Sequence, residues 1–306
     1  MISRAVTRPC IAAAAPVLRA RGGVAAFHAS AAPQATLREL EHRVKSVRNI
    51  EKITKSMKMI AATKLARAQR AMDSAVKFGE ASEEVFKQSG AESPEDGKVL
   101  FVVVSSDKGL CGGIHTSVSR RTRTELTELH NVYGGQLPAI VVLGEKSKAQ
   151  LGRAVPESMR LSFNQIGKDI PSYEDALAIT TTILNSGVEF DKVNIVYNKF
   201  VSSISFESTI MPVFSEKALM QAPNIGQYEM EEDVAKDLAE FSLANAVFAT
   251  LVEGHASEIN SKRNAMDNAS KNAGEMITSL NLLYNRGRQA AITGELIDII
   301  TGALAV

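Results

Sequence analysis

A hydrophobic repeat through the last quarter of the chain constrains the fold most strongly. Alternate steps of four and three residues from Val234 to Thr301 give twenty positions, and fourteen of them are apolar. A 3.5-residue repeat held this long predicts a left-handed coiled coil. At about 1.5 Å per residue, roughly 70 residues make a rod of about 100 Å. A domain of ordinary size cannot bury such a rod along its whole length, so we expect the rod to project or to be enclosed by other proteins.

Small residues occupy this repeat beyond Met266. They are Ala269, Ala273, Gly287, Ala290 and Gly294. Small side chains let helices pack closely, so we expect a partner helix to approach most closely near residues 287–294.

Residues 35–92 supply the expected partner helix, since no proline lies between Pro33 and Pro94. Two apolar blocks have helical spacing: Leu37, Leu40, Val44 and Val47, then Ile50, Ile53, Met57 and Ile60. The step between the blocks is three where a regular heptad needs four, which predicts a stammer.

A cationic stripe lies beside this repeat at Lys45, Arg48, Lys52 and Lys55. From Thr36 to Arg70 there are ten Lys and Arg residues against three Glu. The stripe is either a solvated face or the docking surface for an acidic partner or a nucleic acid. This stretch has no aromatic residue on which bases could stack, which weakens the case for nucleic acid.

The middle of the chain, residues 98–215, alternates strand and helix signals. Buried strands are expected at 99–104, 139–143 and 193–200, surface helices at 120–130 and 173–186, and a hairpin turn near 201–203. A small sheet flanked by helices follows. The complete fold class is therefore α/β, with a long antiparallel coiled coil of N- and C-terminal helices and a small central Rossmann-like domain.

The loop after the first strand reads SSDKGLCGGIH, residues 105–115, and invites a comparison with phosphate-binding loops. The P-loop motif fails because no Lys follows the glycines, and Gly109, Gly112 and Gly113 have the wrong spacing for a dinucleotide fingerprint. Asp107 as an acid and Ser105 or Ser106 as a nucleophile lack a recognisable base. A tight turn with polar capping residues is the favoured interpretation.

Three further predictions come from residues 1–34, from the cysteines and from the histidines. Residues 1–34 contain Arg4, Arg8, Arg19 and Arg21 but no acid, which is typical of a mitochondrial transit peptide, with a basic tail as the alternative. Two cysteines are too few for a disulfide framework. The five histidines are scattered, and none is paired with Cys or His at a ligand spacing, so neither a metal site nor a cofactor is expected.

Three stretches together resemble the γ subunits of F-type ATP synthases in their mitochondrial form. They are RVKSVRNIEKITKSMKMIAATKLARAQ at 43–69, SSDKGLCGGIH at 105–115, and AMDNASKNAGEMI with YNRGRQAAITGELIDIITGALA at 265–277 and 284–305. The resemblance implies a coiled coil of residues 35–92 and 228–303 standing inside a ring of catalytic subunits, with residues 98–215 as a foot on the membrane c-ring.

The same resemblance implies a function and partners. The chain would be the non-catalytic rotor that couples c-ring rotation, driven by proton flow, to conformational cycling of the catalytic subunits. Its partners would be the alpha and beta subunits of the head, the delta and epsilon subunits of the central stalk, and the c-ring, with no nucleic acid and no small-molecule substrate. Its location would be peripheral, on the matrix side of the mitochondrial inner membrane.

By motif position, Arg263, Arg288 and Gln289 would contact the catalytic ring, and Met57 would sit where helix packing governs coupling. Two other classes remain open: a nucleotide-binding α/β protein, which would bind ATP tightly, and a mitochondrial coiled-coil adaptor or nucleic-acid binder, whose nucleic-acid binding would be salt-sensitive.

Overall fold

The chain divides into two units, Met1–Thr36 and Leu37–Val306. The computed structural model describes residues 36–90, 97–133, 137–213, 216–220, 222–224 and 234–305. The predicted transit peptide at 1–34 and residues 228–233 of the predicted C-terminal segment lie outside them.

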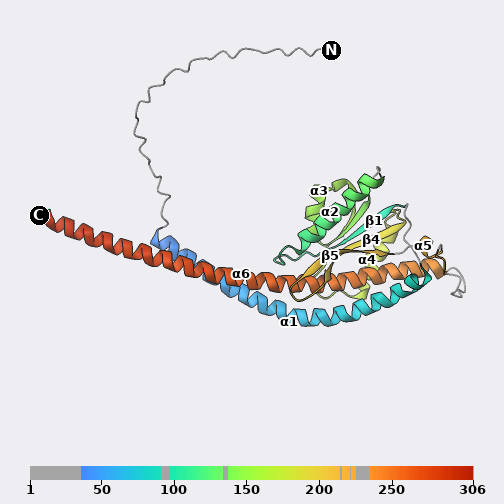
Figure 1. Ribbon diagram of the computed structural model, residues 1–306, viewed down its shortest axis with the longest axis horizontal. Coiled ribbons are helices and arrows are strands. Elements are labelled where there is room, and N and C mark those ends of the chain that lie inside the picture. Colours follow the sequence, from blue (N-terminus) through green and yellow to red (C-terminus); the bar gives the residue numbers. More distant parts are fainter. Residues whose placement is uncertain are drawn as a thin grey trace, which may run out of the picture. The chain divides into compact units, whose positions relative to one another are not determined.

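Two long helices, α1 (Leu37–Ser89) and α6 (Val234–Leu304), run side by side in opposite directions (Figure 1). Between them in sequence lies an α/β domain with shorter helices α2 (Ile114–Tyr133), α3 (Glu145–Ala154), α4 (Tyr173–Asn185) and α5 (Glu216–Met220) and the 3₁₀ turn η1 (Pro156–Ser158). The predicted fold class is confirmed. None of the described helices is long and apolar enough to cross a membrane.

The domain contains one five-stranded sheet in the order β3-β2-β1-β4-β5. Its strands are β1 (Val99–Val104), β2 (Ala139–Leu143), β3 (Met159–Phe163), β4 (Lys192–Phe200) and β5 (Phe206–Val213). The first four are parallel, and β5 pairs antiparallel with β4. Strand β3, with its alternating half-exposed pattern at the sheet edge, escaped the sequence prediction.

Helices cover both faces of the sheet, which explains the continuous apolar runs of its central strands. In β1, Phe101 and Val103 pack with α2 and α3, whereas Leu100, Val102 and Val104 face α4 and α6. The first half of α6 is therefore a structural layer of the α/β domain as well as one strand of the coiled coil.

Helix α6 is buried on nearly all sides between residues 242 and 260. Leu243, Val247 and Leu251 lie one turn apart and pack on the sheet. Ala256 and Ile259 pack against Leu65 and Ala68 of α1. This stretch carries polar as well as apolar side chains, and it is buried because the sheet lies on one side of it and α1 on another.

The predicted stammer in α1 is wrong. Its inward face follows an unbroken 3.5-residue repeat from Leu40 to Gly79, and Glu51, Thr54 and Lys58 continue that repeat where apolar residues were expected. Thr54 is buried, and Lys58 forms a 2.6 Å ion pair with Asp267 of α6. Polar residues at the seam hid the true register, and Ile50, Ile53 and Ile60 of the predicted second block are instead more than half exposed.

The predicted register of α6 beyond Met266 is also partly wrong. Met276 and Leu283 are 53% and 48% exposed. The side chains that turn toward α1 are one residue further along. They are the buried Ser270 and the half-buried Ile277 and Tyr284.

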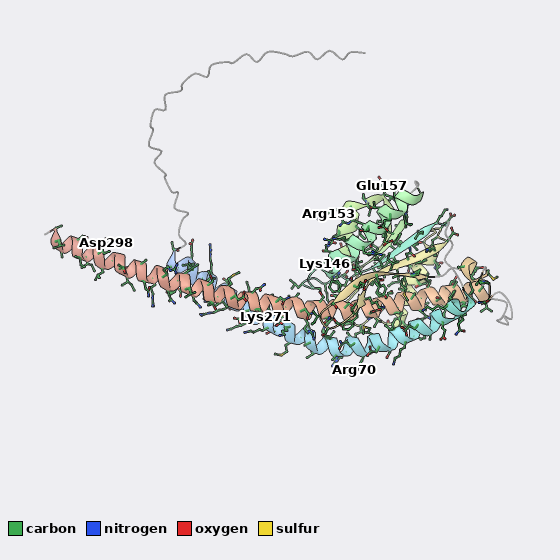
Figure 2. All side chains as sticks on the ribbon, in the orientation of Figure 1. Arg70, Lys146, Arg153, Glu157, Lys271 and Asp298 are labelled. Carbon is green, nitrogen blue, oxygen red and sulfur yellow. The ribbon has the colours of Figure 1, made fainter. Side chains whose placement is uncertain are left out.

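The closest approach of the two long helices lies near the α/β domain and not at residues 287–294. A Cβ at Gly79 of α1 would lie 2.9 Å from Cβ of Ala249, whereas a Cβ at Gly294 would meet nothing within 4 Å. The reason is length: Leu37, the first residue of α1, already lies opposite Gly287, so no described residue of α1 accompanies α6 beyond it. Figure 2 shows Asp298 on this unaccompanied end.

These two glycines give a matched test of the packing. Gly79→Ala forces the fixed Ala249 methyl group away, and the overpacking cost of about 1–3 kcal/mol exceeds the gain of about 1 kcal/mol in helix propensity. We expect a net loss in the free energy of unfolding. For Gly294→Ala we expect a higher free energy of unfolding, because the new methyl group meets no neighbour and only the helix propensity changes. Denaturant unfolding of the purified chain measures both, and a stabilised Gly79→Ala variant would contradict the packing.

Candidate functional site

The crevice at the carboxyl ends of β1 and β4 is where a doubly wound sheet normally binds its ligand. The chain reverses its direction across the sheet at this point. Strands β2 and β3 follow β1 on one side, whereas β4 and β5 lie on the other side of β1. In this protein α6 lies across the crevice. The remaining cavity, lined by residues such as Ser106, Asn198 and Glu258, has a volume of only about 20 Å³.

Polar side chains of α6 bind the loops that emerge from these strands. The Glu253 carboxylate accepts the Phe200 N–H at 3.0 Å, and burial raises the pKa of this carboxyl. Ser261 Oγ donates to the Cys111 carbonyl at 2.5 Å. Helix α6 thus occupies the crevice through hydrogen bonds to the end of β4 and to the loop after β1.

Two further residues of α6 hold the turn between β4 and β5. Asn260 Nδ2 donates to the Ser202 carbonyl at 3.1 Å, and Arg263 Nη2 donates to the Ser203 carbonyl at 3.0 Å. The predicted partner residue Arg263 therefore has an internal role as well.

The loop at 105–113 is a capped turn, as predicted. The Asp107 carboxylate accepts the N–H groups of Glu145 at 2.7 Å and Gln165 at 2.5 Å, which ties three loops together. Gly112 has φ of 65°, but so does Leu110, a non-glycine residue held in the left-handed region. A Cβ at Gly144 would lie 2.6 Å from the Ser106 backbone, so only glycine fits there.

Cys111, His115 and Glu258 meet in one buried cluster, with one ligand atom from each within 4.8 Å of the others. Cys111 Sγ donates to Glu258 Oε1 at 3.4 Å. Burial raises the pKa of the Cys111 thiol to about 12, raises that of Glu258 and lowers that of His115. The expectation that no His pairs with Cys is wrong here, and the four-residue interval between Cys111 and His115 was the available signal.

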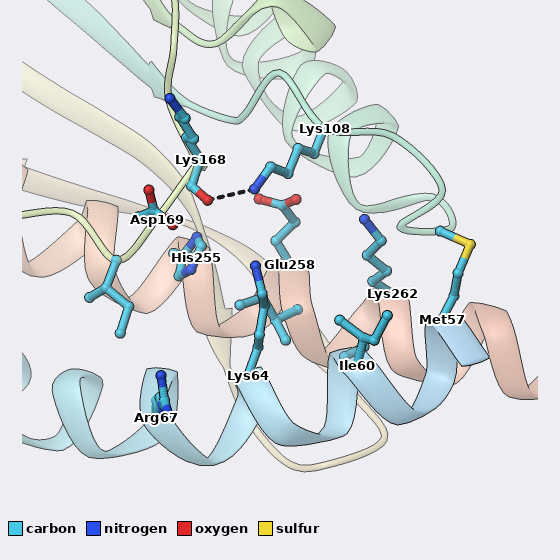
Figure 3. Close-up of a pocket in the computed structure, with 14 residues that line it drawn as sticks. Met57, Ile60, Lys64, Arg67, Lys108, Lys168, Asp169, His255, Glu258 and Lys262 are labelled. Atoms are coloured by element: carbon cyan, nitrogen blue, oxygen red, sulfur yellow. Dashed lines mark hydrogen bonds between the residues drawn. The ribbon is translucent and has the colours of Figure 1, made fainter. Parts of the chain in front are cut away.

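A larger cavity of about 440 Å³ opens between α1, α6 and the loops of the α/β domain (Figure 3). Met57 and Ile60 of α1 and Ile259 of α6 contribute apolar walls. Five basic residues also line it, against Asp169 and Glu258 as the acids. The basic residues are Lys64, Arg67, Lys108, Lys168 and Lys262. An apolar cavity with a basic surround suits an acidic chain segment better than a neutral ligand.

His255 lies in this basic cavity with its Nδ1 unpartnered among the described residues. Burial, reinforced by the charges of Lys108 and Lys64, lowers its pKa to about 4. The side chain is therefore neutral in the folded protein at physiological pH.

The predicted site residues do not form one site. Met57 is half-buried and lines the basic cavity, whereas Arg288 and Gln289 are exposed on α6 beyond the start of α1. Arg263 and Arg288 are separated by 25 helical residues, or about 38 Å at the α-helical rise. Their partner contacts stay a prediction. The basic cavity itself was missed because its residues come from four separate segments.

Exposed apolar side chains mark two further surfaces. One is the α1 stripe of Ile50, Ile53 and Ile60, which the predicted cationic stripe flanks. The other is the unaccompanied end of α6, where six large apolar residues are about half exposed or more: Ile292, Leu296, Ile297, Ile299, Ile300 and Leu304. Apolar surface on this scale is typical of a protein that is partly enclosed by partners.

Comparisons with known proteins agree on one family. The family model described as ATP synthase matches residues 36–306. The mitochondrial ATP synthase subunit gamma of Yarrowia lipolytica is 55% identical over 270 residues, covering 88% of this chain and 92% of that protein. The mitochondrial F(1) complex subunit gamma of Rattus norvegicus is 43% identical, covering 89% of this chain and all of that protein.

Solved structures extend the similarity to the fold. A chain of the central stalk and c-ring structure of Tetrahymena thermophila mitochondrial ATP synthase matches with TM-score 0.56 and 26% identity, covering 71% of this chain and 99% of its own. A chain in the rotor structure of the Euglena gracilis enzyme matches with TM-score 0.69 at 18% identity, covering 84% and 98%. The latter likeness concerns the fold alone.

Asp107 is expected to act structurally. Asp107→Ala leaves two backbone N–H groups without their acceptor, and we expect the free energy of unfolding to fall by about 1–3 kcal/mol. Asp169→Ala removes an exposed carboxylate from a neighbouring loop and serves as the control. Chemical denaturation distinguishes them, and equal stability of the two variants would contradict the proposed capping.

His255 is expected to make the fold acid-sensitive. Between pH 6.5 and about 4 the unfolded chain binds a proton at His255 and the folded chain does not, so stability falls as pH falls through this window. The contribution is at most about 3 kcal/mol. His255→Gln should flatten this part of the stability profile.

The buried carboxyls Glu253 and Glu258, whose pKa values are raised, act in the opposite direction. The difference between wild type and His255→Gln removes their contribution. A difference that does not change between pH 4 and pH 7 would refute the buried neutral histidine.

Proposed function

Because this chain belongs to the family of mitochondrial ATP synthase gamma subunits, we propose that it forms the central stalk of a proton-transporting ATP synthase. Rotation of a membrane c-ring, driven by proton flow, turns the stalk, and its asymmetric helix pair drives the catalytic subunits through their conformational cycle. The observation that carries the proposal is the 55% identity to a gamma subunit across most of both chains. The lone apolar end of α6 supports it, because a partner must cover that end.

The proposed partners follow from the surfaces. The alpha and beta subunits of the head would enclose the C-terminal end of α6 and the adjoining N-terminal part of α1. An acidic segment of the head would approach the basic cavity beside Met57. The delta and epsilon subunits and the c-ring would bind the α/β domain, on the matrix side of the mitochondrial inner membrane. Co-purification of this chain with the head subunits from mitochondria tests the assignment, and its absence from the assembled complex would refute it.

We further propose that the chain has no catalytic activity of its own. The supporting observation is that α6 lies across the crevice between β1 and β4 and leaves a cavity of about 20 Å³, far below the roughly 300–1,000 Å³ of a ligand pocket. The alternative of a nucleotide-binding α/β protein predicts tight ATP binding by the isolated chain. Calorimetric titration with Mg-ATP distinguishes the two, and we expect no saturable binding.

Arg288 is proposed to act in coupling and not in folding. Its side chain is exposed on the unaccompanied end of α6, so Arg288→Ala should leave the assembled complex intact. We expect ATP hydrolysis, or the number of protons pumped per ATP, to change by about twofold or more, as for loss of a hydrogen bond worth about 0.5–1.5 kcal/mol.

The matched control is Arg153→Ala, which removes the same guanidinium group from an exposed position on α3 (Figure 2). Both variants are purified with the complex and compared in subunit content, ATPase rate and proton pumping. Identical rates in the two complexes would show that Arg288 makes no functional contact.

A further inference from the structure

We propose that Cys111, His115 and Glu258 form a binding site for a transition-metal ion, with Zn²⁺ as the best-suited ion. The site does not depend on the proposed function. It joins the loop after β1 and the adjoining first turn of α2 to the middle of α6, 147 residues beyond Cys111. A bound ion would cross-link the α/β domain to the long helix that leaves it.

The donor set suits zinc. Thiolate, imidazole and carboxylate are the three side-chain ligands that Zn²⁺ takes in proteins. With bond lengths of about 2.3 Å to sulfur and 2.1 Å to oxygen, tetrahedral geometry separates the two ligand atoms by about 3.6 Å. Cys111 Sγ and Glu258 Oε1 are 3.4 Å apart, so these two ligands already have nearly the required spacing.

The histidine is oriented as a metal ligand usually is. Its Nε2 donates to the Lys108 carbonyl at 3.0 Å, while Nδ1 is buried and has no hydrogen-bond partner among the described residues. Metal-binding histidines commonly donate one ring N–H to a backbone carbonyl and offer the other nitrogen to the ion. His115 is only 9% exposed, so an unpaired ring nitrogen here is costly unless something binds it.

Charge and space are also compatible with an ion. A thiolate and a carboxylate neutralise Zn²⁺, so the loaded site carries no net charge, which burial requires. Burial and the Glu258 carboxylate raise the pKa of the Cys111 thiol, whereas the amines of Lys262 and Lys108 lower it and favour the ionised form. A cavity of about 20 Å³ beside Glu258, which Ser106 also lines, is large enough for one water.

Binding exchanges a proton for a metal ion. Without metal, the Cys111 thiol keeps its proton and donates a hydrogen bond to the Glu258 carboxylate. On binding, a sulfur–zinc bond replaces the sulfur–hydrogen bond and the proton passes to solvent, with no change in oxidation state.

Cobalt is the probe, because a thiolate ligand gives Co²⁺ a near-ultraviolet charge-transfer absorption. The full chain carries Cys10→Ser, which leaves Cys111 as its single thiol. We expect the absorption to saturate at one equivalent of Co²⁺ and to disappear when Zn²⁺ is added. Cys111→Ser should abolish it, and His115→Asn and Glu258→Gln should each weaken Co²⁺ binding about tenfold or more.

The matched control is His130→Asn, an exposed histidine at the other end of α2, which should bind Co²⁺ like the parent. Circular dichroism confirms that each variant is folded. If His115→Asn does not fold, two other measurements test the proposal. They are the Co²⁺ affinity of the near-isosteric Glu258→Gln variant and the rise in the parent's melting temperature on addition of Zn²⁺. Absence of the charge-transfer band would mean that the Cys111 thiolate does not bind the ion. Equal Co²⁺ affinity in the folded Glu258→Gln variant would mean adventitious metal on a lone thiol, and either result would overturn the proposal.

Discussion

Packing of α6 between the sheet and α1 is the interaction on which the rest of the structure depends. Leu243, Val247 and Leu251 complete the hydrophobic core under one face of the sheet, and Ala256 and Ile259 complete the seam with α1. Helix α4 shares that face of the sheet with α6. The domain and the long helix pair therefore fold as one unit, and a torque applied to the domain reaches α6 through core contacts.

The same helix decides what the α/β domain can do. Its polar residues take up the loops at the crevice where a doubly wound sheet would otherwise bind a ligand, through Glu253, Asn260 and Ser261 among others. In many proteins this fold binds a nucleotide. Here its sheet packs on α6 and joins the α/β domain to the long helix. The surfaces that we propose as partner contacts are the basic cavity beside Met57 and the exposed apolar end of α6.

The seam between the long helices is not uniformly apolar, and this has mechanical consequences. Near the domain, small residues such as Gly79 and Ala249 let the backbones approach closely. Further along, Glu51, Thr54 and Lys58 take seam positions, and the ion pair of Lys58 with Asp267 replaces apolar contact. Exposed ion pairs contribute little stability. The two helices are therefore held together most firmly beside the α/β domain and less firmly around the ion pair.

The sequence by itself determined the long helices and the alternation of strands and helices, because both depend on local periodicity and on the absence of proline. It also determined the family, since three motifs in order leave few alternatives. It could not determine which residues of α1 face α6. The apolar residues Ile50, Ile53 and Ile60 predicted the wrong inward face of α1, because they are exposed apolar residues. The positions that face α6 are instead the polar residues Glu51, Thr54 and Lys58.

Only the tertiary structure decided which distant residues meet. The cavity lined by Lys64, Lys108 and Lys262, and the cluster of Cys111, His115 and Glu258, each join segments whose proximity follows from α6 crossing the sheet. No local pattern encodes that crossing, because it is fixed by side-chain packing between elements more than a hundred residues apart in the sequence.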